Sequence, residues 1–247
     1  MKNLILTHIL ANTGKGGKQL AVLIDPDSIS DEAMLVNTCK MSTAAGADLI
    51  LVGGSLITNG FFERCISIIR EQTDIPVVLF PGNIMQIDEH ADAILFLSLI
   101  SGRNPDMLIG KHVLAAPMLK KSELEVIPTG YMLIDGGNIT SVSYMSNTTP
   151  IPADKSSIAA CTALAGEMLG LRTIYMDAGS GAKQPIPEKL IREVKQQLSI
   201  PLFVGGGIRT PEAAKAAAQA GADIVVVGNA IEKDPSLIAK LVDAVKS

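Results

Sequence analysis

Short, continuously apolar runs recur along this chain, separated by longer stretches with helical spacing. Eight runs are read at residues 20–25, 48–54, 76–80, 92–98, 130–135, 172–178, 201–207 and 223–229. They do not alternate with polar residues, which is typical of parallel strands covered on both faces. Eight strands interleaved with helices over 247 residues predict a single (β/α)8 barrel domain, a TIM barrel, spanning residues 1–247.

The connecting stretches carry signals for where helices begin and end. Helices are predicted at 30–45, 60–72, 185–198, 210–223 and 234–246. In the fourth of these, Thr210 suits the N-cap, Pro211 suits the first helical position and Gly221 suits the end. These start and end signals support helices packed between consecutive strands.

Two stretches depart from a regular barrel. Only eleven residues, 81–91, separate the third and fourth apolar runs, too few for a crossover helix with its two loops. We therefore expect the helix after the third strand to be missing or reduced. After the fifth run, residues 136–157 form a long polar insertion that contains proline.

Composition excludes several classes of function. The formal net charge of −4 and the absence of a basic cluster argue against binding nucleic acid. The chain shows neither a signal peptide nor an apolar run of the ~18 residues that span a membrane, so a cytoplasmic protein is expected. Cys39, Cys65 and Cys161 lack the spacing of a disulfide framework or a zinc site, and buried, inert thiols are expected.

Glycine-rich segments follow the last two apolar runs. VGGGIR (204–209) and VVGNAI (226–231) each stand between a predicted strand and a predicted helix. The loops after strands seven and eight commonly bind phosphate in such barrels, where glycine lets the backbone N–H groups approach an anion. The alternative is that these glycines only make tight turns.

A carboxylate ends the sixth predicted strand. Asp177 lies within YMDAGSGA (175–182), on the same barrel face as the two glycine segments. It can accept a hydrogen bond from a ligand hydroxyl or take its proton, and Ser180 with the backbone of Gly179 and Gly181 can contact phosphate. Alternatively, Asp177 caps a turn.

The first two strands end in oxygen donors. Asp25 in IDPD and Ser55 in GGS would lie on adjacent strands, and Mg²⁺ accepts such a small protein shell when water and substrate phosphates complete its octahedron. A capping role for Asp25 is the alternative. A metal and diphosphate corner at strands one and two, facing a monophosphate corner at strands six to eight, would suit an enzyme that joins two phosphorylated substrates.

At this point the sequence resembles a known family. The segments IDPD, VGGS, LFPGN, FLSLISGRNPDMLIGKHVLAAP, YMSNTTPIP, YMDAGSGA, VGGGIR and VVGN follow the order found in the geranylgeranylglyceryl phosphate synthase family, over roughly residues 15–235. The N-terminal region and YMSNTTPIP are similar to the second group of that family, which is related to heptaprenylglyceryl phosphate synthase.

The resemblance implies a Mg²⁺-dependent prenyl transfer. The C3 hydroxyl of sn-glycerol 1-phosphate would attack C1 of a polyprenyl diphosphate, geranylgeranyl diphosphate above all, forming an ether and releasing diphosphate. The metal positions correspond to Asp25 and Ser55, and we assign the removal of the hydroxyl proton to Asp177 on chemical grounds. The glycerol phosphate positions correspond to Tyr175, Met176, Asp177, Ala178, Gly179, Ser180, Gly181, Gly206, Gly207, Gly228 and Asn229.

The same resemblance implies partners. The prenyl tail requires a long apolar groove, which the leucine- and isoleucine-rich strand ends and helices can line. The family forms dimers and hexamers, so a homo-oligomer is expected. Because the second substrate is a lipid, transient contact with a membrane is a further hypothesis, although no anchor is present.

Two positions depart from the family pattern. The family more often has Glu at the position of Asp177, so the carboxylate of this chain is one methylene shorter. A shift of about 1 Å at a reacting group can cost on the order of a hundredfold in rate. Some members have Lys at Leu23, for which Lys15 or Lys18 is a candidate substitute. The alternatives to a prenyltransferase are a non-catalytic barrel that binds a phosphorylated ligand and another phosphate-binding barrel, of histidine, tryptophan or thiamine biosynthesis.

Overall fold

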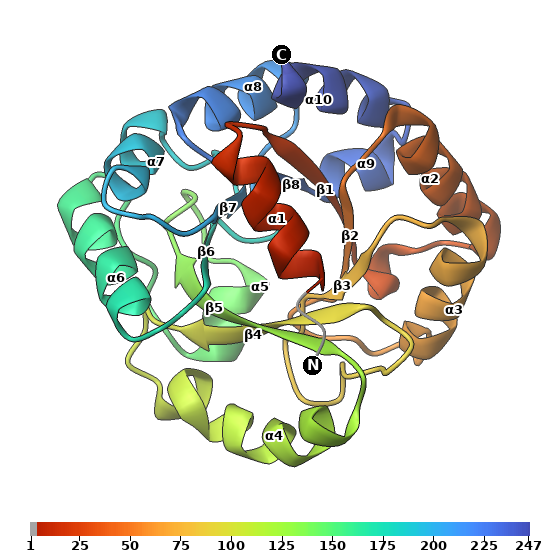
Figure 1. Cartoon of the computed structure of the whole chain (residues 1–247), viewed down its shortest axis with the longest axis horizontal. Coiled ribbons are helices and arrows are strands. Elements are labelled where there is room, and N and C mark those ends of the chain that lie inside the picture. Colours follow the sequence, from red (N-terminus) through yellow and green to blue (C-terminus); the bar gives the residue numbers. More distant parts are fainter. Residues whose placement is uncertain (1–3) are drawn as a thin grey trace.

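The computed structural model describes residues 4–247 and confirms the predicted barrel (Figure 1). Its strands pair in parallel and in chain order, and β1 closes the barrel against β8. The strands are β1 (Gln19–Ile24), β2 (Leu49–Val52), β3 (Val77–Leu79), β4 (Ala93–Leu99), β5 (Glu125–Leu133), β6 (Thr173–Asp177), β7 (Leu202–Gly205) and β8 (Ile224–Val227). Their carboxyl ends therefore form one common mouth.

Helices surround the barrel as an outer ring (Figure 1). The larger ones are α2 (Glu32–Ala45), α3 (Phe62–Gln72), α4 (Lys111–Lys121), α6 (Ser156–Met168), α7 (Glu188–Lys195), α8 (Pro211–Ala220) and α10 (Leu237–Lys246). Two short helices, α5 (Ser141–Ser146) and α9 (Asn229–Lys233), follow β5 and β8. The predicted caps of α8 are confirmed: the Thr210 hydroxyl accepts from the Ala213 N–H at 3.2 Å, and Gly221 ends the helix.

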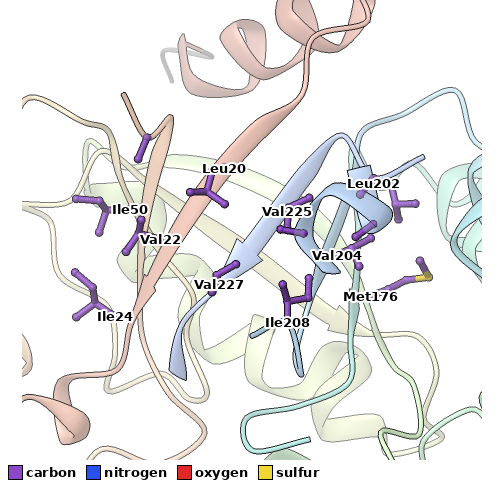
Figure 2. Close-up of a cluster of buried hydrophobic side chains, with 14 of the residues drawn as sticks. Leu20, Val22, Ile24, Ile50, Met176, Leu202, Val204, Ile208, Val225 and Val227 are labelled. Carbon is purple, nitrogen blue, oxygen red and sulfur yellow. The ribbon is translucent and has the colours of Figure 1, made fainter. Parts of the chain in front are cut away.

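The strands are apolar throughout because both of their faces are buried. Leu20, Val22 and Ile24 of β1 point out toward the helices, as do Val225 and Val227 of β8 (Figure 2). The intervening side chains point into the barrel, where they join a second core that includes Ala21 and Val226. A strand covered on both sides needs no polar positions.

An additional helix closes the amino-terminal end of the barrel. Helix α1 (Leu4–Gly14) lies across the barrel in Figure 1, and its Leu6 and Ile9 pack into the inner core. Its first turn is anchored by Glu125 at the start of β5, whose carboxylate accepts from the backbone N–H groups of Ile5 at 2.7 Å and Leu6 at 2.9 Å. This helix was not predicted from sequence.

The expected loss of the helix after the third strand is confirmed. Residues 80–92, between β3 and β4, contain only turns and irregular backbone. The buried Gln86 side chain holds this segment against β2: it accepts from the Gly82 N–H at 3.0 Å and donates to the Gly54 carbonyl at 2.8 Å. One side of the barrel is therefore covered by a loop rather than by a helix.

Strand β5 begins five residues earlier than the run at 130–135 indicated. The strand interior contains Pro128, which lacks an N–H and reads as a strand breaker. Here the proline is tolerated because β6 pairs with β5 only from Thr129 onward, so Pro128 lies where β5 has one neighbour, β4. Its carbonyl still accepts from the Arg172 N–H at 2.8 Å.

The polar insertion and the cysteines are only partly as predicted. The insertion at 136–157 includes α5, and its Ile151 forms a bridge with Ile134. Cys39 and Cys65 are buried, and burial raises their thiol pKa values to about 11 and about 12. The expectation of a buried thiol is wrong for Cys161, which is exposed on α6. In residues 4–247, no helix combines the length and apolar character needed to cross a membrane.

Candidate active site

A polar pocket opens at the carboxyl ends of the strands. Most of the predicted site residues line it: Asp25, Ser55, Tyr175, Asp177, Ser180, Gly181, Gly206, Gly207, Gly228 and Asn229. They come from the ends of β1, β2, β6, β7 and β8, so the barrel brings together residues up to two hundred positions apart. The ends of parallel strands meet at this face, which explains the convergence.

Asp177 is the most buried carboxylate of this pocket, with 7% of its surface exposed. Its Oδ2 accepts from the Tyr131 hydroxyl at 2.6 Å, and its Oδ1 accepts from the Gly179 N–H at 2.6 Å. Burial raises the pKa of Asp177, although both hydrogen bonds oppose the shift by favouring the charged form. The carboxylate therefore does cap the turn after β6, and it also faces the pocket.

Tyr131 sits in a stack of aromatic rings that fills the upper barrel. Its ring contacts Tyr175 edge-on at 5.6 Å between centroids and Phe80 at 5.7 Å, and Tyr175 stacks on Phe203 at 5.7 Å. Burial raises the pKa of the Tyr131 phenol well above its ordinary value, so it remains a proton donor to Asp177. The packed rings fix the hydroxyl position.

The glycines after β7 are required by both conformation and space. Gly206 and Gly207 have φ values of +82° and +71°, and a Cβ at Gly206 would lie 2.6 Å from the Asp177 Oδ1. Within residues 4–247, the backbone N–H groups of these two glycines donate to no protein acceptor. Free N–H groups at a turn that side chains cannot obstruct are suited to binding an anion.

The loops after β6 and β8 are joined by hydrogen bonds. The Asn229 Oδ1 accepts from the Ser180 hydroxyl at 3.2 Å and from the Gly181 N–H at 3.2 Å. Arg209, at the end of the VGGGIR segment, lines the same pocket and donates to the carbonyls of Ala182 and Lys183. This guanidinium adds positive charge beside the free N–H groups, which favours a phosphate there.

The corner at β1 and β2 has the donor set that the sequence predicted for a cation. The Asp25 Oδ1 accepts from the Asp27 N–H at 3.0 Å, so Asp25 also caps the turn at Pro26–Ser28. A Cβ at Gly54 would lie 2.9 Å from both Asp25 oxygens, so glycine there leaves room beside the carboxylate, and Ser55 follows directly. Burial raises the pKa of Asp25.

These donors fit a magnesium ion better than a transition metal. Residues 4–247 contain no group of three or more His, Cys, Asp or Glu side chains that could hold a metal ion. Mg²⁺ is commonly bound by one or two protein oxygens with water and substrate phosphates filling the remaining positions. The pair Asp25 and Ser55 meets that description.

Several predicted residues lie outside the pocket. The Met176 side chain points away from the mouth into the outer core (Figure 2), and Ala178 is buried. The Gly179 N–H is occupied by Asp177. Lys15 and Lys18 precede β1, at the opposite end of the barrel, where Lys18 pairs with Asp223 at 3.8 Å. Neither lysine can therefore take the place of the lysine that some family members have at the position of Leu23.

An apolar cavity adjoins the polar pocket. It lies between the loop that replaces the missing helix and α4, and its lining includes Ile84, Ile87, Phe96, Met107, Ala115 and Leu119. The two hollows share the lining residues Gly54, Ser55, Phe80, Tyr131 and Val142. A ligand with a polar end and a long apolar tail could therefore occupy both.

Sequence reasoning missed four polar residues of the pocket: Tyr131, Ser141, Arg209 and Glu232. Arg209 was inside a quoted motif and could have been found from its place at a strand end. Tyr131 lies two positions before the end of β5 and had no distinguishing signal. Glu232 follows Asn229 by three positions on α9, so a helix that begins at Asn229 would have placed the two on one face.

Comparisons with known proteins agree with this geometry. The model of the PcrB family matches residues 17–247. A geranylgeranylglyceryl phosphate synthase from Chitinophaga pinensis is 56% identical over 245 residues, 99% of this chain and 97% of the relative. A synthase of the same name from Thermococcus kodakarensis is 45% identical over 87% of this chain and 85% of its own.

A solved structure shares the whole fold. The crystal structure of (S)-3-O-geranylgeranylglyceryl phosphate synthase from Thermoplasma acidophilum, in complex with its substrate sn-glycerol-1-phosphate, superposes with a TM-score of 0.92 at 37% identity. The match covers 100% of this chain and 99% of that one. The similarity therefore includes every strand end that lines the pocket.

Proposed function

This chain belongs to the PcrB family, and we propose that it is a prenyltransferase that joins geranylgeranyl diphosphate to the C3 hydroxyl of sn-glycerol 1-phosphate. The products are an ether-linked geranylgeranylglyceryl phosphate and diphosphate. Its relatives are named as synthases of this product, geranylgeranylglyceryl phosphate. The related structure from Thermoplasma acidophilum contains sn-glycerol-1-phosphate.

One observation carries the proposal: the phosphate pocket and the apolar cavity meet at a shared wall. Ser55, Phe80 and Tyr131 belong to both linings. A glycerol phosphate held at the glycine loops and a prenyl chain held in the apolar cavity would bring the hydroxyl and the allylic carbon together at this wall. Such positioning converts a bimolecular step into an effectively unimolecular one.

Asp177 is the residue that we assign to the proton of the attacking hydroxyl. Its buried carboxylate is held on both oxygens, by Tyr131 and by the Gly179 N–H, so its orientation is determined before substrate arrives. A pKa raised by burial makes the carboxylate a stronger proton acceptor. The Tyr131 hydrogen bond supports this assignment for a side chain one methylene shorter than Glu, because it fixes where the carboxylate lies.

The phosphate of sn-glycerol 1-phosphate is assigned to the loops after β6, β7 and β8. The free N–H groups of Gly206 and Gly207 lie there with Ser180 and Arg209. Gly228 and Asn229 complete the wall on the β8 side. Tyr175 lies below, with its ring in the aromatic stack. These contacts would orient the glycerol so that its free hydroxyl faces Asp177.

Asp25 and Ser55 are assigned to Mg²⁺. When bound, the ion neutralises charge on the departing diphosphate, which is the main electrostatic demand of breaking an allylic carbon–oxygen bond. Asp25 supplies a carboxylate beside the open space at Gly54, and Ser55 supplies a hydroxyl at the border of the apolar cavity. This placement assigns the diphosphate end of the prenyl donor to the β1–β2 corner.

The apolar cavity is assigned to the prenyl chain. It has no counterpart in a barrel with a complete helix ring, because the segment at 80–92 and α4 line it where a crossover helix would pack. Burial of a methylene contributes about 0.8 kcal/mol, so a long chain gains substantial affinity there. Assembly as a homo-oligomer and transient contact with a membrane, through which the lipid substrate would enter, remain parts of this proposal.

The test is a turnover assay with labelled sn-glycerol 1-phosphate, geranylgeranyl diphosphate and Mg²⁺. We expect an ether product that extracts into chloroform, with the sn-3 enantiomer inactive and EDTA abolishing turnover. Bound glycerol phosphate without product from any prenyl donor would contradict the synthase assignment and favour the non-catalytic barrel. Turnover that persists in EDTA would contradict only the Mg²⁺ assignment.

A further inference from the structure

Glu232 is an acidic residue of the pocket to which the reaction above gives no role. It lies on α9, directly after β8, and it lines the pocket together with Asp25, Ser180 and Asn229. The charged residues of this lining are Asp25, Asp177, Arg209 and Glu232. Since Arg209 donates to the carbonyls of Ala182 and Lys183, Glu232 is not paired with it.

On one side, Glu232 sets the orientation of Asn229. The Asn229 amide donates through Nδ2 to the Glu232 Oε2 at 3.2 Å, which leaves Oδ1 to accept from Ser180 and Gly181. A side-chain amide has its donor and acceptor at opposite positions, so an acceptor beside one end determines what the other end presents. The carboxylate therefore holds the loop after β6 through Asn229.

On the other side, Glu232 faces the loop after β1. Its carboxylate lies close to the Ser28 side chain and to the backbone N–H of Asp25. That loop is in turn fixed to the loop after β2, because Asp27 accepts from the Thr58 N–H and hydroxyl, both at 2.9 Å. A row of polar contacts thus crosses the mouth from the loops after β6 and β8 to the corner at β1 and β2.

We propose that Glu232 is a positioning residue that couples the two substrate corners by bridging Asn229 to the Asp25–Ser28 turn. Through these contacts, a ligand at the diphosphate corner would change the affinity of the phosphate loops for glycerol phosphate. The inference rests on the proposed function, because it assigns one substrate to each corner. It gives Glu232 no contact with substrate.

Calorimetric titration of sn-glycerol 1-phosphate tests the coupling. The titration is run on the full chain, with and without MgCl₂ plus inorganic diphosphate. Glu232→Ala is expected to raise the Kd for glycerol phosphate about tenfold, the loss of one charged hydrogen bond. The factor by which magnesium diphosphate changes that Kd in the unaltered protein should fall toward one.

Further variants separate coupling from a general structural role. Because Glu232 acts through Asn229, the double variant Asn229→Ala/Glu232→Ala should bind no more weakly than Asn229→Ala alone. Glu232→Gln keeps an acceptor oxygen and should remain within about threefold of the unaltered protein. Ser28→Ala should lower the coupling factor while leaving the Kd without metal unchanged, which keeps the test usable if Glu232→Ala fails to fold.

Glu212→Ala is the matched control. Glu212 is an exposed carboxylate at the start of α8, the helix after β7, and it does not line the pocket. Its removal should change neither Kd nor the coupling factor. Thermal unfolding of each variant is followed in parallel.

Three results would overturn the inference. The first is a Kd and coupling factor unchanged in Glu232→Ala, and the second is strictly additive losses in the double variant. The third is a loss of Mn²⁺ binding, measured by electron paramagnetic resonance, as large in Glu232→Ala as in Asp25→Ala, which would make Glu232 a metal ligand. If the unaltered protein does not bind sn-glycerol 1-phosphate, the proposed function fails instead.

Discussion

The two halves of the barrel mouth are built in different ways. The half at β6 to β8 presents backbone donors: its glycines leave N–H groups free, and Asn229, Ser180 and Arg209 hold the loops together. The half at β3 to β5 is lined by apolar side chains from a loop and from α4. The first half follows from short contiguous motifs, whereas the second depends on a helix that is missing.

Under the proposed function, this difference explains how one barrel would hold two unlike substrates. A phosphate needs donors at fixed positions, and backbone at strand ends provides them without losing side-chain entropy. A prenyl chain needs only volume and apolar surface, so many side-chain combinations can serve. The variants below alter one half and should spare the other, in order of the expected effect.

The largest effect is expected from removing the Asp177 carboxylate. Asp177→Ala should lower kcat by on the order of 10³, the usual scale for a lost general base, because the hydroxyl proton has no other placed acceptor. Binding of sn-glycerol 1-phosphate should persist, since its phosphate contacts remain. Single-turnover kinetics with calorimetry measure both, and Asp177→Glu, the side chain more usual in the family, should remain active. Full activity in Asp177→Ala would reject the assignment.

A change at Gly206 should damage the phosphate half alone. In Gly206→Ala, the Cβ would lie 2.6 Å from the Asp177 Oδ1 at a φ of +82°, so the loop must move and phosphate affinity should fall by about a hundredfold. The matched control is Gly60→Ala, where φ is +67° but the Cβ meets no atom within 4 Å. Calorimetry should show weakened binding only in the first variant. Equal losses in both would mean that backbone strain, not the site, is responsible.

The apolar half can be narrowed without touching the phosphate half. Ala115 of α4 is buried and lines the apolar cavity, so Ala115→Phe should lower kcat/KM for geranylgeranyl diphosphate by roughly tenfold while sparing a shorter prenyl donor. Ala116 is the next residue of the helix and is exposed, which makes Ala116→Phe the control. Steady-state kinetics with donors of two lengths provide the measurement. Equal losses with both donors would place the chain elsewhere.

The smallest effect is expected from removing the Tyr131 hydroxyl, which lies at the wall shared by the two halves. The Tyr131 hydrogen bond lowers the pKa of Asp177 against the larger effect of burial, so Tyr131→Phe should raise that pKa further. Because a base must be deprotonated to act, the acid limb of kcat/KM should move to higher pH, with a several-fold loss below it and little change above it. A pH–rate profile of both proteins tests this. An acid limb that stays in place or moves to lower pH would contradict the pairing.

Burial of Asp177 also makes the free energy of unfolding depend on pH. A carboxylate whose pKa is raised on folding favours the folded state below its unfolded pKa, and that contribution is lost as pH rises through the folded value. Replacement by Asn should therefore relieve a cost at neutral pH. Chemical denaturation of Asp177→Asn near pH 7 should show equal or greater stability than the unaltered protein.

Much of the barrel followed from periodicity. The expected strands coincide with β1 to β8 within a few residues, except β5, where Pro128 concealed the first half. Helices α1, α4 and α6 were not predicted. Helix α4 contains Pro117 and follows a π-helical turn at Asp106–Gly110, so its local signals conflict with its structure. Helix α1 is stabilised by Glu125, more than a hundred residues away.

The site residues likewise divide into those that local sequence could predict and those that depend on tertiary contacts. Asp25, Ser55, Asp177 and the glycines could be named because their positions at strand ends are a local property of the sequence, and the barrel makes strand ends converge. Tyr131 and Arg209 act through partners on distant segments, Asp177 for Tyr131 and the Ala182 carbonyl for Arg209, and Glu232 of α9 meets Asp25 only at the barrel mouth. Pairings of this kind depend on the register between strands and on side-chain direction.

The sequence by itself thus determined the barrel, its missing helix, and the glycine motifs to which phosphate binding is assigned, because each depends on hydrophobic periodicity or on the backbone freedom of glycine over a few residues. The tertiary structure decided which oxygen of Asp177 meets Tyr131, that Glu232 lies in one pocket with Asp25, and where the apolar cavity opens. Those features depend on distances between elements far apart in the chain, and such distances are set only when the barrel closes.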